Sequence, residues 1–221
     1  MPIKALIFDL DGTLVDTAPD LMAATNHVMQ AAGRAELSDA QIRAFVGHGS
    51  MALIKLGLKA SGALPDEAEL LQLQKLFLDY YGDNIASHSK VFDGVIPLLD
   101  QARAAGMKLG VCTNKVERLA NRLLRTIDLA PYFSAVVGGD TMPVMKPSPV
   151  PYLETARRLG VEVVTTVMFG DSETDIRTAQ NVGVPVIAVS FGYTHAPVAT
   201  FNPSHVIDHF DAAWDLVQTL G

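Results

Sequence analysis

Residues 5–13 read Ala-Leu-Ile-Phe-Asp-Leu-Asp-Gly-Thr, a short apolar run that is interrupted by two aspartates and closed by a glycine. A brief apolar run bounded by turn residues is typical of a buried strand. We therefore expect a strand over 5–10 that stops at Asp11 and Gly12. Such a strand would deliver Asp9 and Asp11 at its carboxyl end.

A regular alternation of apolar runs and helical patterns follows in the second half of the chain. Helices are expected over 95–105, 116–126, 150–159 and 174–182, and strands over 107–112, 135–138, 165–169 and 186–189. This alternation predicts an α/β fold with a doubly wound, Rossmann-like parallel sheet and helices on both faces. In such folds the chemistry collects at the carboxyl ends of the strands.

The segment between the first strand and this alternation has only helical patterns. Apolar residues recur at helical spacing, and Ser38 with Gln41 resembles a capping box that opens a short helix. We therefore predict an inserted all-helical cap domain over 15–83 and a core domain formed by 1–14 and 84–221.

Composition excludes several classes of protein. The 221 residues are 49% hydrophobic with a net charge of −7 and no cluster of basic residues, which argues against disorder and against a nucleic-acid partner. No uninterrupted apolar run reaches the length of a membrane span, so no membrane partner is expected and a cytoplasmic protein is predicted. The single cysteine, Cys112, lies in an apolar run and is expected to be a core residue.

Four polar clusters follow predicted strands or the loops after them. They are 9–13 (Asp-Leu-Asp-Gly-Thr), Thr113-Asn114, Lys146-Pro147 and 171–175 (Asp-Ser-Glu-Thr-Asp). Helix capping explains one such cluster, because Asp, Ser and Thr are favoured at helix starts. Four clusters converging on one edge of a sheet indicate a functional site.

In this order the four motifs resemble those of the haloacid dehalogenase superfamily, over essentially the whole chain. The segments 16–21, 45–49 and 146–151 are similar to those of phosphoglycolate phosphatases. The resemblance implies a phosphomonoester hydrolase that works through an aspartyl-phosphate intermediate, with a small phosphorylated metabolite, 2-phosphoglycolate, as substrate. A sugar phosphate, pyrophosphate or a nucleotide monophosphate is the alternative substrate, because cap sequences diverge.

The resemblance also implies roles for the acidic residues. Asp9 is the nucleophile, and Mg²⁺ is held by the carboxylates of Asp9 and Asp171 and the backbone carbonyl of Asp11. The charges of the site also favour a metal ion. When a phosphomonoester dianion lies beside two carboxylates, each pair of like charges repels by about 4 kcal/mol at ~4 Å and an effective dielectric of ~20. One lysine does not offset this cost, whereas a hard divalent cation does.

The remaining core residues receive supporting roles. Crowding by other carboxylates would raise the pKa of Asp11, which would then donate a proton to the leaving group and later accept one from water. The alternative is that Asp11 only binds metal or caps a turn. Thr113, Asn114 and Lys146 are expected to bind the phosphoryl group, and Asp175 to orient Lys146 or a metal-bound water. Gly12 is expected to form a strained turn and Thr13 a local hydrogen bond.

Three cap residues are candidates for contact with the leaving group. Gly47 and His48 are expected in a loop between two cap helices, and Arg43 could bind a substrate carboxylate in a bidentate manner. A loop histidine and a helix arginine are also commonly just solvated, so both interpretations stay open.

Related chemistries are separated by single residues. Dehalogenases lack the second aspartate of the first motif and phosphonatases usually carry alanine there, so Asp11 argues against both. Leu21 stands where β-phosphoglucomutases carry histidine, and Thr13 where they typically carry valine.

A dinucleotide-binding domain would need a Gly-x-Gly-x-x-Gly turn after the first strand, and a non-catalytic binding module would be expected to lack a core residue. The sequence does not decide between a monomer and a homodimer.

Overall fold

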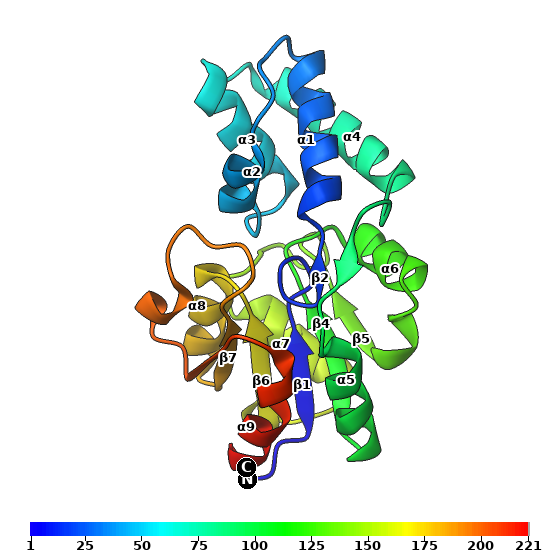
Figure 1. Ribbon diagram of the computed structural model, residues 1–221, viewed down its shortest axis with the longest axis vertical. Helices are drawn as coiled ribbons and strands as arrows, with labels where there is room; N and C mark the ends of the chain where they lie inside the picture. The colour runs from blue at the N-terminus through cyan, green and yellow to red at the C-terminus, as the bar shows by residue number, and fades with distance from the viewer. Residues whose placement is uncertain (221) are drawn as a thin grey trace.

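The computed structural model describes residues 1–220, and the chain forms a six-stranded sheet with helices on both faces and a separate group of helices beyond one end of the sheet (Figure 1). The strands and α-helices run in the order β1 Ala5–Phe8, β2 Val15–Asp16, α1 Ala18–Ala31, α2 Asp39–Phe45, α3 Ser50–Ser61, α4 Glu67–Asp83, β3 Lys90–Val91, α5 Val95–Ala104, β4 Lys108–Cys112, α6 Glu117–Thr126, β5 Ala135–Val137, α7 Val150–Leu159, β6 Thr166–Gly170, α8 Glu173–Val182, β7 Val186–Val189, β8 His205–Ile207 and α9 Ala213–Thr219. The prediction of a doubly wound α/β fold with a helical insertion is confirmed.

All neighbouring strands of the large sheet are parallel, in the order β5-β4-β1-β6-β7-β8. In this register Phe8 of β1 lies opposite Val111 of β4 and Phe169 of β6. The residues that follow these three positions are therefore brought to the same edge of the sheet.

The strand residues alternate between two apolar cores. In β1, Leu6 and Phe8 belong to the core under α5, α6 and α9, whereas Ala5 and Ile7 belong to the core under α7 and α8. This is the period of two that a strand buried on both faces imposes on its side chains. Cys112 lies in the second core, where burial raises the pKa of its thiol to about 12, so it packs as an apolar residue.

The sequence analysis missed the edge strand β8. It has three residues, of which Val206 is exposed, and so it lacks the continuous apolar run that marks the inner strands. The predicted bounds of the other core elements differ from the structure by at most one residue at either end, except for β1, which stops two residues earlier than expected because the chain turns after Phe8.

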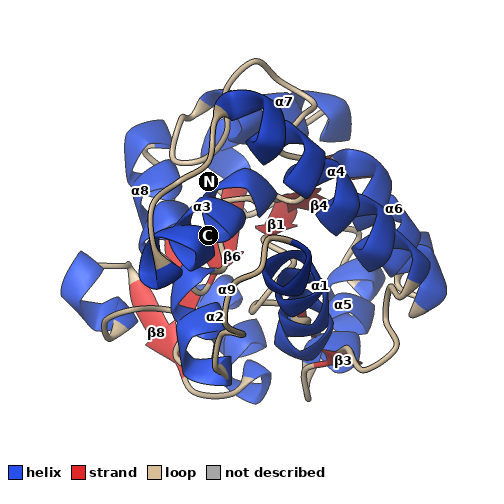
Figure 2. Ribbon diagram, turned by 90° about the horizontal axis from the view of Figure 1, so that it is seen from above, coloured by secondary structure: helices blue, strands red, loops and turns tan. Residues whose placement is uncertain are grey.

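Helices α1–α4 pack on one another beyond the carboxyl ends of the strands; Figure 1 shows them at the top and Figure 2 shows the same face from above. The capping box predicted at Ser38 and Gln41 is present at the start of α2. The chain enters this helical group after β2 and returns through β3, and these two short strands pair antiparallel, Val15 with Val91 and Asp16 with Lys90. The two crossings thus lie side by side. The division into 15–83 and the rest stays a prediction.

No helix among residues 1–220 is both long enough and apolar enough to cross a membrane.

Candidate active site

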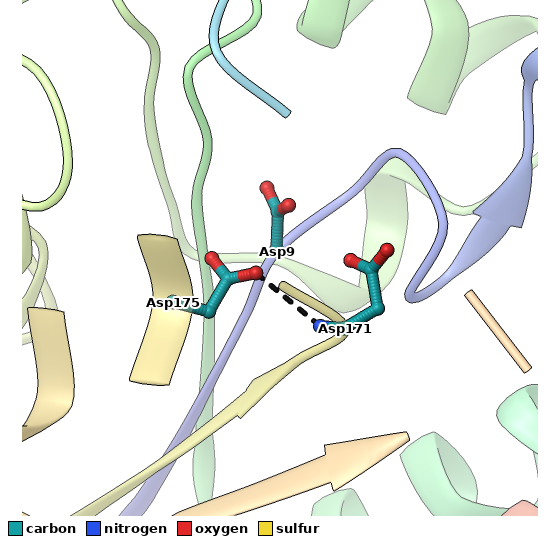
Figure 3. Close-up of side chains that lie close together, drawn as sticks. All are labelled: Asp9, Asp171 and Asp175. Atoms are coloured by element: carbon teal, nitrogen blue, oxygen red, sulfur yellow. Dashed lines mark hydrogen bonds between the residues drawn. The ribbon is translucent and has the colours of Figure 1, made fainter. Parts of the chain in front are cut away.

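Three buried aspartates meet where β1 and β6 end. Asp9 follows β1, Asp171 follows β6, and Asp175 lies in the first turn of α8 (Figure 3). One carboxylate oxygen from each lies within 4.8 Å of the other two, and all three residues are buried. The expected convergence of residues 9 and 171, which are distant in the sequence, is therefore present.

The turn after β1 needs a glycine. Gly12 has a positive φ of +82°, which residues other than glycine rarely adopt. A Cβ atom there would overlap Asp171 Oδ2 and lie 2.8 Å from the Tyr193 ring. The turn predicted at Gly12 is present, in a conformation that would be strained for any other residue. It allows the chain to pass directly against Asp171.

Asp171 is held by partners from two other segments. The hydroxyl of Thr13 donates to Oδ1 at 2.9 Å, and the backbone N–H of Tyr193 donates to Oδ2 at 2.6 Å. The prediction of a local hydrogen bond for Thr13 is wrong, because the turn at Gly12 points this hydroxyl across the site toward a residue 158 positions away. Burial, with Asp175 and Asp9 nearby, raises the pKa of Asp171 well above its ordinary value.

Lys146 is buried between two of the aspartates. Its Nζ lies 2.6 Å from Asp175 Oδ1 and 3.0 Å from Asp9 Oδ1. Burial alone would lower the pKa of Lys146, but Asp175 and Asp9 raise it above its ordinary value, so the lysine carries its charge. The backbone of Lys146 is held by Asn114, whose amide accepts from its N–H at 3.0 Å and donates to its carbonyl at 3.1 Å.

Asp175 holds Lys146 and caps α8 at the same time. Its Oδ2 accepts from Ser172 Oγ at 2.6 Å and from the backbone N–H groups of Ser172 and Asp171, at 3.1 and 3.2 Å, while its Oδ1 accepts from Lys146. Figure 3 shows the bond to the Asp171 backbone. Helix capping and support of the site were alternative interpretations of this motif, and one carboxylate serves both.

Asp9 keeps an oxygen without a hydrogen bond. Its Oδ1 forms an ion pair with Lys146 Nζ at 3.0 Å but has no hydrogen-bond partner among the residues described. Burial is the largest effect on this carboxyl and raises its pKa to about 6. A buried anionic oxygen of this kind, beside a second carboxylate, fits a hard divalent cation such as Mg²⁺.

Asp11 faces a lysine that the sequence analysis did not single out. Lys115 Nζ donates to Asp11 Oδ1 and Oδ2 at 2.8 and 3.1 Å, and Thr17 Oγ1 donates to Oδ1 at 2.7 Å. The expected crowding of Asp11 by other carboxylates is thus replaced by an ion pair. The only available signal for Lys115 was its position directly after Thr113 and Asn114.

The structure separates the three cap candidates. Gly47 approaches the core, where its carbonyl accepts from Asn114 Nδ2 at 3.1 Å. His48 lies in the same loop but lines a different hollow, together with Lys146 and Arg177. Arg43 does not contact the three buried aspartates of the site. Its guanidinium instead pairs with Asp39 at 2.9 Å and Asp16 at 3.4 Å, and it lies over the Tyr193 ring.

A cavity of about 50 Å³ lies between Asp9 and Asp11 on one side and the cap helices on the other. Its polar side comes from the core and its apolar side mainly from the cap. The lining residues are Asp9, Asp11, Leu21, Val46, Gly47, Gly49, Ser50, Leu53, Phe77, Leu78, Tyr81, Thr113, Asn114, Lys115, Val116 and Leu119. Thr113 follows β4, as expected, and so borders the space beside Asp9.

Known proteins of one family resemble the chain over nearly its whole length. Residues 6–189 match the family of haloacid dehalogenase-like hydrolases. A phosphoglycolate phosphatase of Mesorhizobium japonicum is 44% identical over 94% of this chain and 91% of its own, and one of Caulobacter vibrioides is 42% identical over 93% and 86%. A crystal structure described as a predicted phosphoglycolate phosphatase from Haemophilus somnus superposes with a TM-score of 0.90 at 28% identity, covering 98% of each chain.

Proposed function

The chain belongs to the haloacid dehalogenase-like hydrolase family, and on this premise we propose that it is a phosphatase that hydrolyses 2-phosphoglycolate. The observation that carries the proposal is the buried Asp9 carboxylate, with one oxygen free of hydrogen bonds, beside Asp171 and Lys146. The substrate is taken from the relatives named phosphoglycolate phosphatase, and the small cavity supports it.

Asp9 acts as the nucleophile in the proposed reaction. A carboxylate oxygen of Asp9 attacks phosphorus, the bond from phosphorus to the glycolate oxygen breaks, and an aspartyl-phosphate forms. Water then attacks this phosphorus, the bond to the Asp9 oxygen breaks, and inorganic phosphate leaves. Splitting the transfer in this way requires one group that gives a proton to the glycolate oxygen and takes one from the water.

We assign this proton transfer to Asp11. Its side chain borders the same cavity as Asp9, and Lys115 and Thr17 hold the carboxyl in one orientation. As a carboxylate, Asp11 takes a proton from the attacking water in the second step and gives it to the glycolate oxygen of the next turnover. A fixed orientation helps both transfers, because each needs the carboxyl group within hydrogen-bonding distance of the reacting oxygen.

We assign to Thr113 and Lys146 the stabilisation of the negative charge on the transferring phosphoryl group. Lys146 is rigid because Asp175 and Asp9 bind its ammonium and Asn114 binds its backbone. A donor fixed before the reaction stabilises developing charge without reorganisation. Asn114 thus serves the phosphoryl site through Lys146 and through Gly47 in the cap.

Mg²⁺ is the proposed metal, held by the carboxylates of Asp9 and Asp171 and the backbone carbonyl of Asp11. When bound, it supplies positive charge that offsets the repulsion between these carboxylates and the substrate. Thr13 and Tyr193 orient Asp171 for this purpose, and Asp175 is left to Lys146 because both of its oxygens already accept hydrogen bonds. The compartment proposed is the cytoplasm, supported by the single, buried cysteine.

A panel of phosphate esters tests the proposal. Phosphate release is measured with Mg²⁺ for 2-phosphoglycolate, glucose 6-phosphate, pyrophosphate and a nucleoside monophosphate. We expect the highest kcat/KM for 2-phosphoglycolate and loss of activity in excess EDTA. A hundredfold preference for a sugar phosphate would contradict the substrate, and full turnover in EDTA would contradict the metal.

A further inference from the structure

The active-site cavity contains a buried cation with no role so far in binding substrate. The side chain of Lys115 is 5% exposed, and among residues 1–220 it is the one cation that lines the cavity. Burial alone would lower the pKa of Lys115, but Asp11 beside it raises this pKa above its ordinary value, so the ammonium stays charged. The ammonium has three N–H donors, and Asp11 accepts from it with two oxygens.

A buried hydroxyl without a partner lies next to this lysine. Lys115 Nζ is 4.3 Å from the centre of the Tyr81 ring, and Tyr81 also lines the cavity. Among the residues described, nothing forms a hydrogen bond with Tyr81 Oη, although the side chain is almost completely buried. Buried hydroxyls are nearly always paired, so this one is available to a group bound in the cavity that Tyr81 lines.

The protonation state of Tyr81 suits it to bind an anion. Burial raises the pKa of Tyr81 to about 12, so at neutral pH the hydroxyl keeps its proton and is a donor. The phenol and the ammonium together offer hydrogen-bond donors and one positive charge. A carboxylate accepts from both kinds of donor.

The apolar side chains on the cap side of the cavity strengthen such an interaction. Leu21, Leu53 and Phe77 belong to the cap side of the cavity and carry no polar side-chain atoms. Next to these apolar side chains a charged pair interacts more strongly than at the surface. The volume of about 50 Å³ is only a few times the minimum that holds one water molecule, so a leaving group of very few atoms fits best.

We propose that Lys115 Nζ and Tyr81 Oη form the subsite that binds the carboxylate of the leaving hydroxy acid, and that this pair selects anionic leaving groups. The inference rests on the proposed function, because it names the residues that would distinguish phosphoglycolate from uncharged esters. It gives the task predicted for Arg43 to a lysine and a tyrosine that line the cavity.

The test compares two esters that differ only in the charged group. For each variant, kcat/KM is measured for 2-phosphoglycolate and for 2-hydroxyethyl phosphate, which has a hydroxymethyl group in place of the carboxylate, and the first value is divided by the second. Tyr81→Phe removes one donor to a charged group, so we expect this ratio to fall about 10-fold or more. Lys115→Met removes the charge as well, so its ratio is expected to fall about 100-fold.

Tyr80→Phe is the matched control. Tyr80 is the preceding residue of α4, but it stacks on His27 on the outer side of the cap and lines a different hollow. Its ratio should equal that of the wild type. Thermal unfolding of each variant shows whether it is folded, and Tyr81→Phe alone decides the outcome if Lys115→Met does not fold.

The outcomes separate this inference from the proposed function. A wild-type preference for phosphoglycolate that survives Tyr81→Phe unchanged would overturn the inference and leave the proposed function intact. A wild-type enzyme that hydrolyses both esters equally would contradict the proposed substrate, and the subsite with it. A fall in the ratio for Tyr81→Phe but not for Tyr80→Phe would support the subsite.

Discussion

The single residue on which the chemistry depends is Asp9, and an amide in its place tests both reactivity and charge. Asp9→Asn keeps the shape of the side chain but removes the nucleophilic oxygen, so turnover should fall by more than about 10³-fold. Because burial raises the pKa of Asp9 to about 6, the charged form is disfavoured in the folded protein, so the neutral amide should leave thermal stability unchanged or raised. Phosphate release and thermal unfolding measure the two effects, and a near wild-type rate would contradict the nucleophile assignment.

At the scale of an element, the turn between β1 and β2 sets the position of Asp171. Gly12→Ala adds a methyl group that would meet both Asp171 and Tyr193 at a positive φ, so the Asp171 carboxylate must move. We expect a loss of kcat/KM of at least about 100-fold, because a displacement of about 1 Å in a catalytic site has effects of this size. A raised requirement for Mg²⁺ should accompany the loss, since Asp171 is a proposed ligand.

Gly33→Ala provides a matched control for this substitution. Gly33 also has a positive φ, of +65°, but nothing lies within 4 Å of the added methyl group. Backbone strain is therefore common to both variants, and costs about 1–2 kcal/mol, while the clash is specific to Gly12. Equal activity of the two alanine variants would contradict the assigned role of the turn.

Local sequence patterns predicted the inner strands of the sheet but not its edge strand. The inner strands and their helices were predictable because each has a continuous apolar run or a helical period, and the polar residues that end β1, β4 and β6 marked the edge of the sheet. The edge strand β8 has neither signal. Its pairing with β7 is a property of the assembled sheet.

Long-range pairing also limits what could be predicted about the site. Thr13 pairs with Asp171 across 158 positions and Lys115 with Asp11 across 104, and neither separation leaves a mark in the local sequence. Arg43 illustrates the converse. Its residue type suits a substrate carboxylate, but the start of α2 and the strand β2 place Asp39 and Asp16 beside it.

For the whole molecule, the buried acidic residues that form the site lower the free energy of unfolding. Burial disfavours the charged forms of Asp9 and Asp171, and Lys146 is the one cation that contacts Asp9 among residues 1–220. A cation that binds the folded state alone stabilises it by an amount that grows with the logarithm of the cation concentration above Kd. Folding and metal binding should therefore be coupled.

This coupling predicts how stability changes with pH. Burial raises the pKa of Asp9 from 3.8 to about 6, so between these values the folded protein holds a proton that the unfolded chain has released. The free energy of unfolding contributed by this group falls as pH rises through that range and stays low above it. Without metal, Tm should be lower at pH 7.5 than at pH 5 by roughly 3–5 °C relative to Asp9→Asn, because the bound proton contributes about 1.4 kcal/mol at pH 5. Mg²⁺ should restore Tm at pH 7.5 and have little effect at pH 5, where protonated Asp9 is a poor ligand. Thermal unfolding in EDTA and in Mg²⁺ at both pH values measures this, and an equal effect of Mg²⁺ on wild type and Asp9→Asn would contradict the ligand assignment.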